Sequence, residues 1–184
     1  MHRVDGPALE SAGDLVISVP LNQIELAGPV ALWFRRGRLH REDGPAIQDA
    51  RGSTLWYVNG KLHREGGPAI DDADARVRCW FLDGRAHREG SPAVESDGPE
   101  MEWDDLVLFG RAEVWLRHGA IHRHRAPAIV DEVGNERWYR DGRLHRDDGP
   151  AAINDEGRPA EPSFRTAWYR DGKLVRLEPW SDGE

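Results

Sequence analysis

The feature of this sequence that most constrains its fold is a short tandem repeat. Trp33, Gly37, His40 and Pro45 set a pattern with offsets of 4, 7 and 12 residues from the tryptophan. The same pattern begins again at Trp56, Trp80, Trp115 and Trp138. A partial copy starts at Trp168 and has Val175 at the histidine position. Repeats of this length are single supersecondary units that stack on their neighbours, so the chain is predicted to be a linear array of small identical units.

The spacing of the copies predicts the organisation of the chain. Uninterrupted copies lie 23 or 24 residues apart, whereas the third and fourth tryptophans are 35 residues apart and the fifth and sixth are 30 apart. We therefore expect one repeat domain over 1–184, with insertions between copies and an irregular covering strand near 14–19. Its predicted parts are an N-terminal half-repeat with irregular strands (1–30), repeats (31–93), an insertion (94–113), repeats (114–176) and a C-terminal cap (177–184).

Each copy contains a turn dipeptide that ends in glycine, as in Asn59-Gly60. A two-residue type I′ turn requires positive φ at both central positions, and Asn-Gly and Asp-Gly are its preferred sequences. In the second copy this turn places Val58 opposite Lys61, Tyr57 opposite Leu62 and Trp56 opposite His63. Because side chains alternate along a strand, Trp and His are expected on one face and the aromatic–aliphatic pairs on the other.

A Gly-Pro-Ala corner, such as 44–46, follows the histidine in most copies and should bend the chain, because proline donates no hydrogen bond to a sheet. The predicted fold is therefore all-β: an elongated antiparallel meander of tandem β-hairpin repeats in a single-layer twisted sheet, with no helix of normal length. A residue needed for stacking must recur in every copy, so the recurring residues are interpreted as a structural ladder. That ladder comprises Trp33, His40, Trp56, His63, Trp80, His87, Trp115, His122, Trp138, His145 and Trp168.

The repeat resembles the MORN repeat, a β-hairpin unit. The closest agreement is with the variant that carries Trp-Tyr, Asp-Gly, His-Arg and Asp-Gly-Pro-Ala, seen here at 138–139, 141–142, 145–146 and 148–151. Similar proteins occur in bacterial, phage and giant-virus genomes, and some are described as antitoxins. The resemblance implies an elongated single-layer sheet and a scaffold or binding role. The sequence departs from the standard MORN pattern by having arginine, as at Arg41, where that pattern has glycine.

Charge and cysteine content limit the classes of function. The formal net charge is −8, which disfavours binding to nucleic-acid phosphates or anionic membranes and fits a partner with a basic surface. The single cysteine, Cys79, allows no internal disulfide and is expected to be buried. No apolar stretch is long enough to span a bilayer, and the first residues lack the apolar core of a signal peptide, so a cytoplasmic location is expected.

Few residues suggest chemistry. The one dense histidine group is His118, His122 and His124, two of which would share a strand face as metal ligands can. His122 is the repeat histidine, however, and no third or fourth ligand is evident nearby. The sequence contains no phosphate-binding loop, nucleophile elbow or zinc-ligand spacing. We therefore expect no metal, no cofactor and no enzymatic activity.

The insertion at 94–113 is the strongest candidate for a partner site. Six carboxylates fall within eleven residues and are mixed with, or followed by, apolar residues. An acidic loop that presents an aromatic anchor would be typical of a binding hot spot. The alternative is an additional hairpin whose Trp103 and Phe109 pack on the sheet. The predicted partner-binding residues are Glu100, Glu102, Trp103, Asp104, Asp105 and Phe109.

Three functional hypotheses follow. The first is a non-enzymatic acidic module that occludes a basic protein target, as an antitoxin, immunity protein or phage anti-defence inhibitor would. The second is a structural or assembly module that self-associates through sheet edges, for instance as a homodimer. The third is a metal or small-ligand binding protein that uses the histidine group.

Overall fold

A computed structural model describes residues 7–19, 22–103, 106–154 and 164–180. Strands and turns form all the regular structure of these residues, which confirms the all-β antiparallel fold class. No helix in this part of the chain has the length and hydrophobicity required to cross a bilayer. The chain divides into two compact units, which are described separately. Unit 1 comprises Met1–His87 and Glu102–Leu106, and unit 2 comprises Arg88–Met101 and Val107–Glu184.

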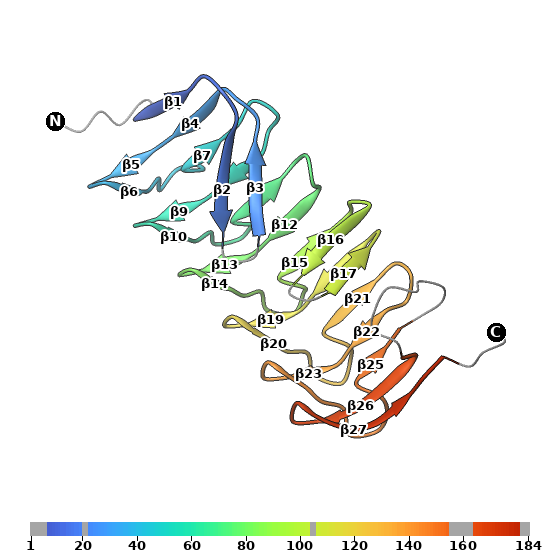
Figure 1. The fold of residues 1–184 in the computed structure, drawn as a ribbon. Coiled ribbons are helices and arrows are strands. Elements are labelled where there is room, and N and C mark those ends of the chain that lie inside the picture. The colour runs from blue at the N-terminus through green and yellow to red at the C-terminus, as the bar shows by residue number, and fades with distance from the viewer. Residues whose placement is uncertain (1–6, 20–21, 104–105, 155–163, 181–184) are drawn as a thin grey trace. The chain divides into compact units, whose positions relative to one another are not determined.

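Unit 1 contains six main strands that pair antiparallel (Figure 1). In sheet order they are β1 (Leu9–Ser11), β4 (Val30–Leu32), β7 (Ile47–Gln48), β8 (Thr54–Leu55), β11 (Ile70–Asp72) and β12 (Val77–Cys79). Their register places one buried row across the sheet: Leu32, Ile47, Leu55, Ile70 and Cys79. Burial raises the pKa of the Cys79 thiol to about 12, as expected for a structural cysteine that stays protonated.

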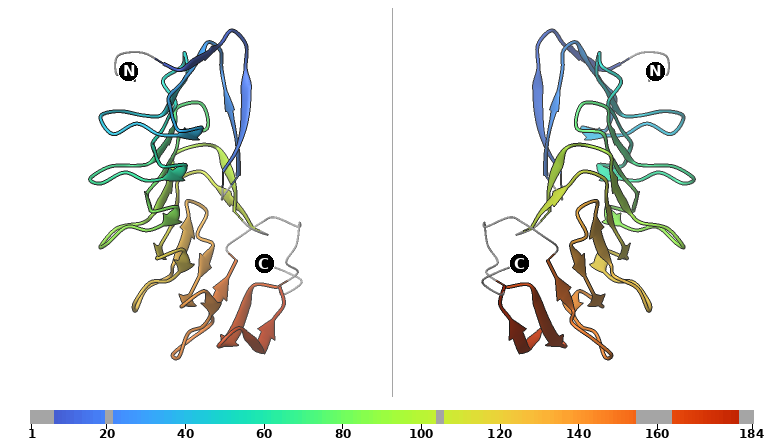
Figure 2. Two further views of the ribbon diagram at one scale, coloured as in Figure 1. Left: turned by 90° about the vertical axis from the view of Figure 1, so that its left-hand side faces the viewer. Right: turned by 90° about the vertical axis from the view of Figure 1, so that its right-hand side faces the viewer.

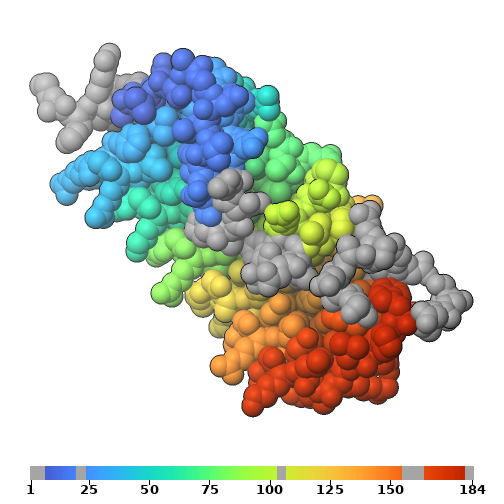
Figure 3. All heavy atoms as spheres, viewed as in Figure 1, coloured from blue at the N-terminus to red at the C-terminus, as the bar shows by residue number. Residues whose placement is uncertain are grey.

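Three short hairpins project from the main strands of unit 1 (Figures 1 and 2), and in the space-filling view their ends stand out as separate protrusions (Figure 3). They are β5 (Phe34–Arg35) with β6 (Arg38–Leu39), β9 (Tyr57–Val58) with β10 (Lys61–Leu62), and β13 (Phe81–Leu82) with β14 (Arg85–Ala86). The turn residues Asn59 and Gly60 have φ of 51° and 80°, as a type I′ turn requires. The predicted pairs Val58–Lys61 and Tyr57–Leu62 are confirmed.

Unit 2 repeats this arrangement. Its main strands, in sheet order, are β15 (Val94–Ser96), β18 (Ala112–Val114), β21 (Ile129–Asp131), β22 (Glu136–Arg137), β25 (Ala152–Ile153), β26 (Thr166–Arg170) and β27 (Lys173–Glu178). Its projecting hairpins are β19 (Leu116–Arg117) with β20 (Ala120–Ile121), and β23 (Tyr139–Arg140) with β24 (Arg143–Leu144). In the last copy the hairpin and the main strands are continuous, and β26 and β27 pair with a bulge after Trp168.

The β-hairpin meander is as predicted, but a full copy contains more strands than the one hairpin expected from its turn. It has four short strands, because the chain leaves the main strands at the tryptophan and enters a projecting hairpin. The N–H of Trp56 donates to the carbonyl of Ala69 at 2.7 Å, within the main-strand layer. The carbonyl of the same residue accepts from the N–H of His63 at 3.0 Å, within the hairpin. The N–H group of Trp56 thus bonds to the main strands, whereas its carbonyl group bonds within the projecting hairpin.

The irregular N-terminal segment forms a hairpin that covers the main strands of unit 1. β2 (Leu15–Val19) pairs with β3 (Asn22–Leu26) along its full length, and Figure 2 shows this hairpin standing beside one face of the unit. Ile24 and Leu26 are buried. The predicted covering strand is therefore one half of a covering hairpin. The predicted N-terminal half-repeat begins at 2–6, which lie outside the described residues.

Candidate functional site

In the first, second and fifth copies the recurring arginine is enclosed between the tryptophan and the glycine that precedes the repeat proline. The Cζ atom of Arg64 lies 4.0 Å from the centroid of the Trp56 ring, and its Nη1 donates to the carbonyl of Pro68 at 3.0 Å. A Cβ at Gly67 would lie 2.9 Å from Cζ of Arg64, so glycine leaves room for the guanidinium. Cation–π contacts of this kind recur in Arg41–Trp33 (4.1 Å), Arg123–Trp115 (3.7 Å), Arg146–Trp138 (3.8 Å) and Arg176–Trp168 (4.6 Å).

The repeat histidines of the first, second, fourth and fifth copies each bond to the copy that follows. Nδ1 of His63 accepts a hydrogen bond from the N–H of Asp83, the first turn residue of the following hairpin, at 3.2 Å. The same bond links His40 to Asn59 (3.0 Å), His122 to Asp141 (3.2 Å) and His145 to Asp171 (3.1 Å). A neutral ring that accepts at Nδ1 carries its proton on Nε2, so these bonds also set the tautomer. The ladder histidines with these bonds are thus engaged in holding the array together.

A second recurring position went unrecognised in the sequence. The residue four after each repeat proline is small, polar and buried: Asp49, Asp72, Ser96, Asp131 and Asn154. Oδ1 of Asp49 accepts from the N–H groups of Arg51 and Ser53, at 3.0 and 2.7 Å, and closes the turn. Its Oδ2 accepts from the N–H of Ala27 at 3.0 Å and so fixes the covering hairpin. The fixed offset from proline is the sequence signal that could have identified this position.

Asp131 has the equivalent role in unit 2. Its Oδ1 accepts from the N–H of Asn135 at 2.9 Å, and its Oδ2 accepts from Nδ2 of Asn135 at 2.8 Å and from the N–H of Phe109 at 3.1 Å. Phe109 ends β17 (Leu106–Phe109), which pairs with β16 (Glu100–Trp103) in the insertion. A buried carboxylate therefore fixes the base of the insertion hairpin.

The role of this buried position can be tested at Asp72 through the pH dependence of protein stability. Burial raises the pKa of its carboxyl group, against the effect of hydrogen bonds from the N–H groups of Asp74 and Ala75. A carboxyl whose pKa is higher in the folded than in the unfolded state stabilises the fold when protonated, so this contribution is lost as the pH rises through the folded pKa. We expect Asp72→Asn to raise the free energy of unfolding at pH 7 and to have no stabilising effect at pH 3. Urea unfolding at both pH values measures this; an equal gain at both would contradict it.

The predicted partner-binding residues lie on the insertion hairpin. Along β16, Glu100 and Glu102 are exposed and Met101 between them is buried; along β17, Val107 is exposed and Leu108 is buried. Phe109 is half-buried. The side chain of Trp103 and the residues Asp104 and Asp105 lie outside the described residues. In the described part, buried Met101 and Leu108 thus alternate with exposed Glu100, Glu102 and Val107, and the choice between the two arrangements, which depends on Trp103, stays open.

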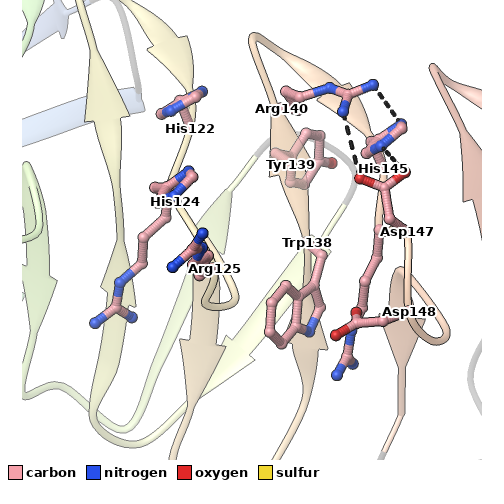
Figure 4. A pocket seen from close by; sticks show the side chains of 11 residues that line it. His122, His124, Arg125, Trp138, Tyr139, Arg140, His145, Asp147 and Asp148 are labelled. Atoms are coloured by element: carbon pink, nitrogen blue, oxygen red, sulfur yellow. Dashed lines mark hydrogen bonds and ion pairs between the residues drawn. The ribbon is translucent and has the colours of Figure 1, made fainter.

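A groove lies between residues 122–125 of the fourth copy and the hairpin of the fifth copy (Figure 4). Its volume is about 490 Å³. One wall carries His122, His124 and Arg125, and the other includes Trp138 and Tyr139. His118 is exposed and does not line this groove. Among the described residues, no group of three or more His, Cys, Asp or Glu side chains is arranged to hold a metal ion.

The fold and these contacts define a tandem-repeat protein built from β-hairpins, with a Trp–Arg stack within five of the copies and histidine bridges between neighbouring copies. Comparison with known proteins gave no match to a family model, a curated protein or a solved structure.

Proposed function

We propose that this protein is a non-enzymatic binding module that occludes a protein target with a basic surface through its insertion hairpin. The observation that carries the proposal is the exposure of Glu100 and Glu102 on β16 and of Val107 on β17, the strand that pairs with it. A small apolar patch within an acidic rim is the usual anatomy of a binding hot spot. A role as an antitoxin, immunity protein or anti-defence inhibitor in a cytoplasm, and membership of the MORN-like family, belong to the same proposal.

The rigidity of this face supports the proposal. Met101 and Leu108 are buried beneath it, and the N–H of Gly110 donates to the carbonyl of Pro99 at 2.8 Å at the base of the hairpin. Glu95 is held by Arg88 at 2.6 Å, so it does not add to the exposed carboxylates. A surface that is already ordered loses little conformational entropy on binding. The recurring Trp, Arg and His residues described above have structural contacts, which leaves the insertion as the stretch most suited to recognition.

Charge reversal on the hairpin tests this function. Affinity capture from the native or phage-infected host would compare the wild type with Glu100→Lys/Glu102→Lys, and with the control Glu10→Lys/Glu65→Lys, whose carboxylates are also exposed. Each variant changes two glutamates and so raises the net charge by the same amount. We expect a stoichiometric basic partner to bind the wild type and the control, to weaken with added salt, and to lose at least about 100-fold in affinity for the hairpin variant.

Two results would overturn the proposal. If both variants bound the partner equally, the hairpin would not be the binding surface. If no partner were captured and the protein formed concentration-dependent oligomers, an assembly role would be the better account.

That second candidate is favoured by one observation at a sheet edge. β27 is the last strand in the order of its sheet, and its Leu174, Val175 and Leu177 are 53%, 64% and 45% exposed. Unpaired strand edges with apolar side chains recruit further strands, including those of a second copy.

A further inference from the structure

In two copies of the repeat, a carboxylate of the chain occupies a position between the repeat histidine and a hairpin arginine. In the first copy Oε1 of Glu42 lies 2.9 Å from Nη1 of Arg35 and 3.3 Å from Nε2 of His40. In the fifth copy Asp147 has the same role, with Oδ1 3.0 Å from Nε2 of His145 and Oδ2 3.5 Å from Nη1 of Arg140. The dashed lines in Figure 4 mark this second set. The repeat therefore contains an anion position that the chain itself fills.

The fourth copy has the arginine and the histidine of this pattern in its sequence but lacks the carboxylate. Arg117 and His122 stand at the same offsets from Trp115 as Arg35 and His40 do from Trp33. The residue two after the repeat histidine is a carboxylate in the other four full copies: Glu42, Glu65, Glu89 and Asp147. In the fourth copy it is His124, and the next residue is Arg125. The segment between the repeat histidine and the repeat proline, which contains a carboxylate in the other full copies, therefore has basic residues in the fourth copy.

Arg125 is also held in an unfavourable backbone conformation. Its φ is +57°, in the left-handed region, where the second and third copies have Gly66 and Gly90 at φ of 75° and 69°. A non-glycine residue in this region costs about 1 kcal/mol, and such strain gathers at functional positions. Arg125 and His124 are both exposed at this corner.

The side chains on the opposite wall of the groove indicate which kind of chemical group would be attached to a bound anion. Trp138 and Tyr139 line the facing wall and are both half-buried, so they offer apolar ring surface together with the cationic wall. In the fifth copy, Arg140 and His145 already have Asp147 as a partner. On the fourth-copy side the carboxylate of Asp141 lies 3.0 Å from Nδ1 of His122, and His124 and Arg125 stand where other copies have a carboxylate and a glycine or aspartate.

We propose that this groove binds a carboxylate joined to an aromatic or other apolar group. The carboxylate lies beside His122, His124 and Arg125, much as Glu42 and Asp147 lie beside the histidines of their own copies. The attached apolar group lies against Trp138 and Tyr139. A carboxylate is favoured because both groups that fill the equivalent positions are carboxylates. The ligand is a free organic acid or an acidic side chain of another protein, and this site does not depend on the function proposed for the insertion hairpin.

NMR titration tests the proposal with three probes: phenylacetate, the blocked dipeptide N-acetyl-Glu-Phe-amide and phenyl phosphate. We expect phenylacetate or the dipeptide to shift the indole N–H signal of Trp138 with a dissociation constant on the order of 1 mM. Preferential binding of phenylacetate identifies a free organic acid, and preferential binding of the dipeptide identifies an acidic protein segment. No binding of either at about 20 mM, or binding of phenyl phosphate alone, would overturn the proposal.

Two substitutions make the test specific. His124→Glu restores the repeat pattern and should weaken probe binding at least about tenfold, because the chain would again supply its own carboxylate. Its circular dichroism spectrum and melting curve check that the fold is retained. In unit 1, Glu42→Gln should create a second site beside Arg35 and His40. The matched control Glu65→Gln should not, since the second copy has Val58 at the arginine position. Binding that His124→Glu leaves unchanged would overturn the proposal.

Discussion

Replacing Trp56 with alanine is expected to lower the free energy of unfolding of unit 1 by about 3 kcal/mol. The ring is half-buried and stacks 4.0 Å from Cζ of Arg64, whose guanidinium also donates to Pro68. Removing the ring leaves a cavity and exposes one face of a cation that was enclosed between Trp56 and Gly67. The loss lies at the lower end of the range for Trp→Ala substitutions because the ring is only partly buried.

Urea unfolding followed by far-UV circular dichroism would measure this effect. Trp56→Phe is the matched control: it keeps an aromatic face for Arg64 and should cost about half as much. In a double-mutant cycle, Trp56→Ala and Arg64→Gln should be coupled by about 1 kcal/mol, because each removes the partner of the other. A loss below about 1 kcal/mol for Trp56→Ala would contradict a structural role for the stack.

Asp131→Ala is expected to destabilise unit 2 by about 3 kcal/mol and to release the base of the insertion hairpin. The carboxylate accepts three hydrogen bonds, two from Asn135 and one from the N–H of Phe109. Hydrogen bonds to a charged group are stronger than neutral ones, and their loss leaves buried donors unsatisfied. Hydrogen exchange should therefore speed up at the amides of Phe109 and Asn135 before the rest of unit 2 opens.

The control for this substitution is the neighbouring residue Glu132. It is exposed, and its Oε2 accepts one bond, from the N–H of Arg111 at 2.9 Å, so Glu132→Ala should cost less than about 1 kcal/mol. Equal losses for the two variants, or unchanged exchange at Phe109, would show that Asp131 does not hold the hairpin. If the insertion hairpin binds a partner, Asp131→Ala should also weaken that binding.

The hairpins were the most predictable part of the fold because their determinants are local. A type I′ turn at Asn59-Gly60 or Asp141-Gly142 leaves one register for the residues on either side, so the cross-strand pairs follow from the sequence alone. The register predicted for the second copy recurs in the other hairpins, which contain the pairs Phe34–Leu39, Phe81–Ala86, Leu116–Ile121, Tyr139–Leu144 and Tyr169–Leu174.

The features that were missed depend on contacts with other parts of the chain. The break at each tryptophan arises because its N–H bonds to the residue after the proline, 13 positions along the chain for Trp56 and Ala69. The role of Asp49 became visible only with the covering hairpin in place, since an aspartate in a turn has an ordinary local explanation. The insertion follows no repeat template, so its alternation of exposed and buried residues could not be read from the other copies. The predicted roles of Trp103, Asp104 and Asp105 stay predictions.

The histidine bridge has a consequence for how such a chain can change in length. The acceptor on one copy and the donor on the next stand at fixed positions of the repeat, as in His40 with Asn59 and His63 with Asp83. Duplication or deletion of a whole copy preserves every such bond, because any copy can follow any other. Gain or loss of part of a copy would shift the next hairpin along the chain. The histidine Nδ1 would then face a residue other than the first turn residue, and the bond would be lost. The fold therefore favours variation in length by whole copies, while inserted segments are accommodated between the proline corner of one copy and the tryptophan of the next.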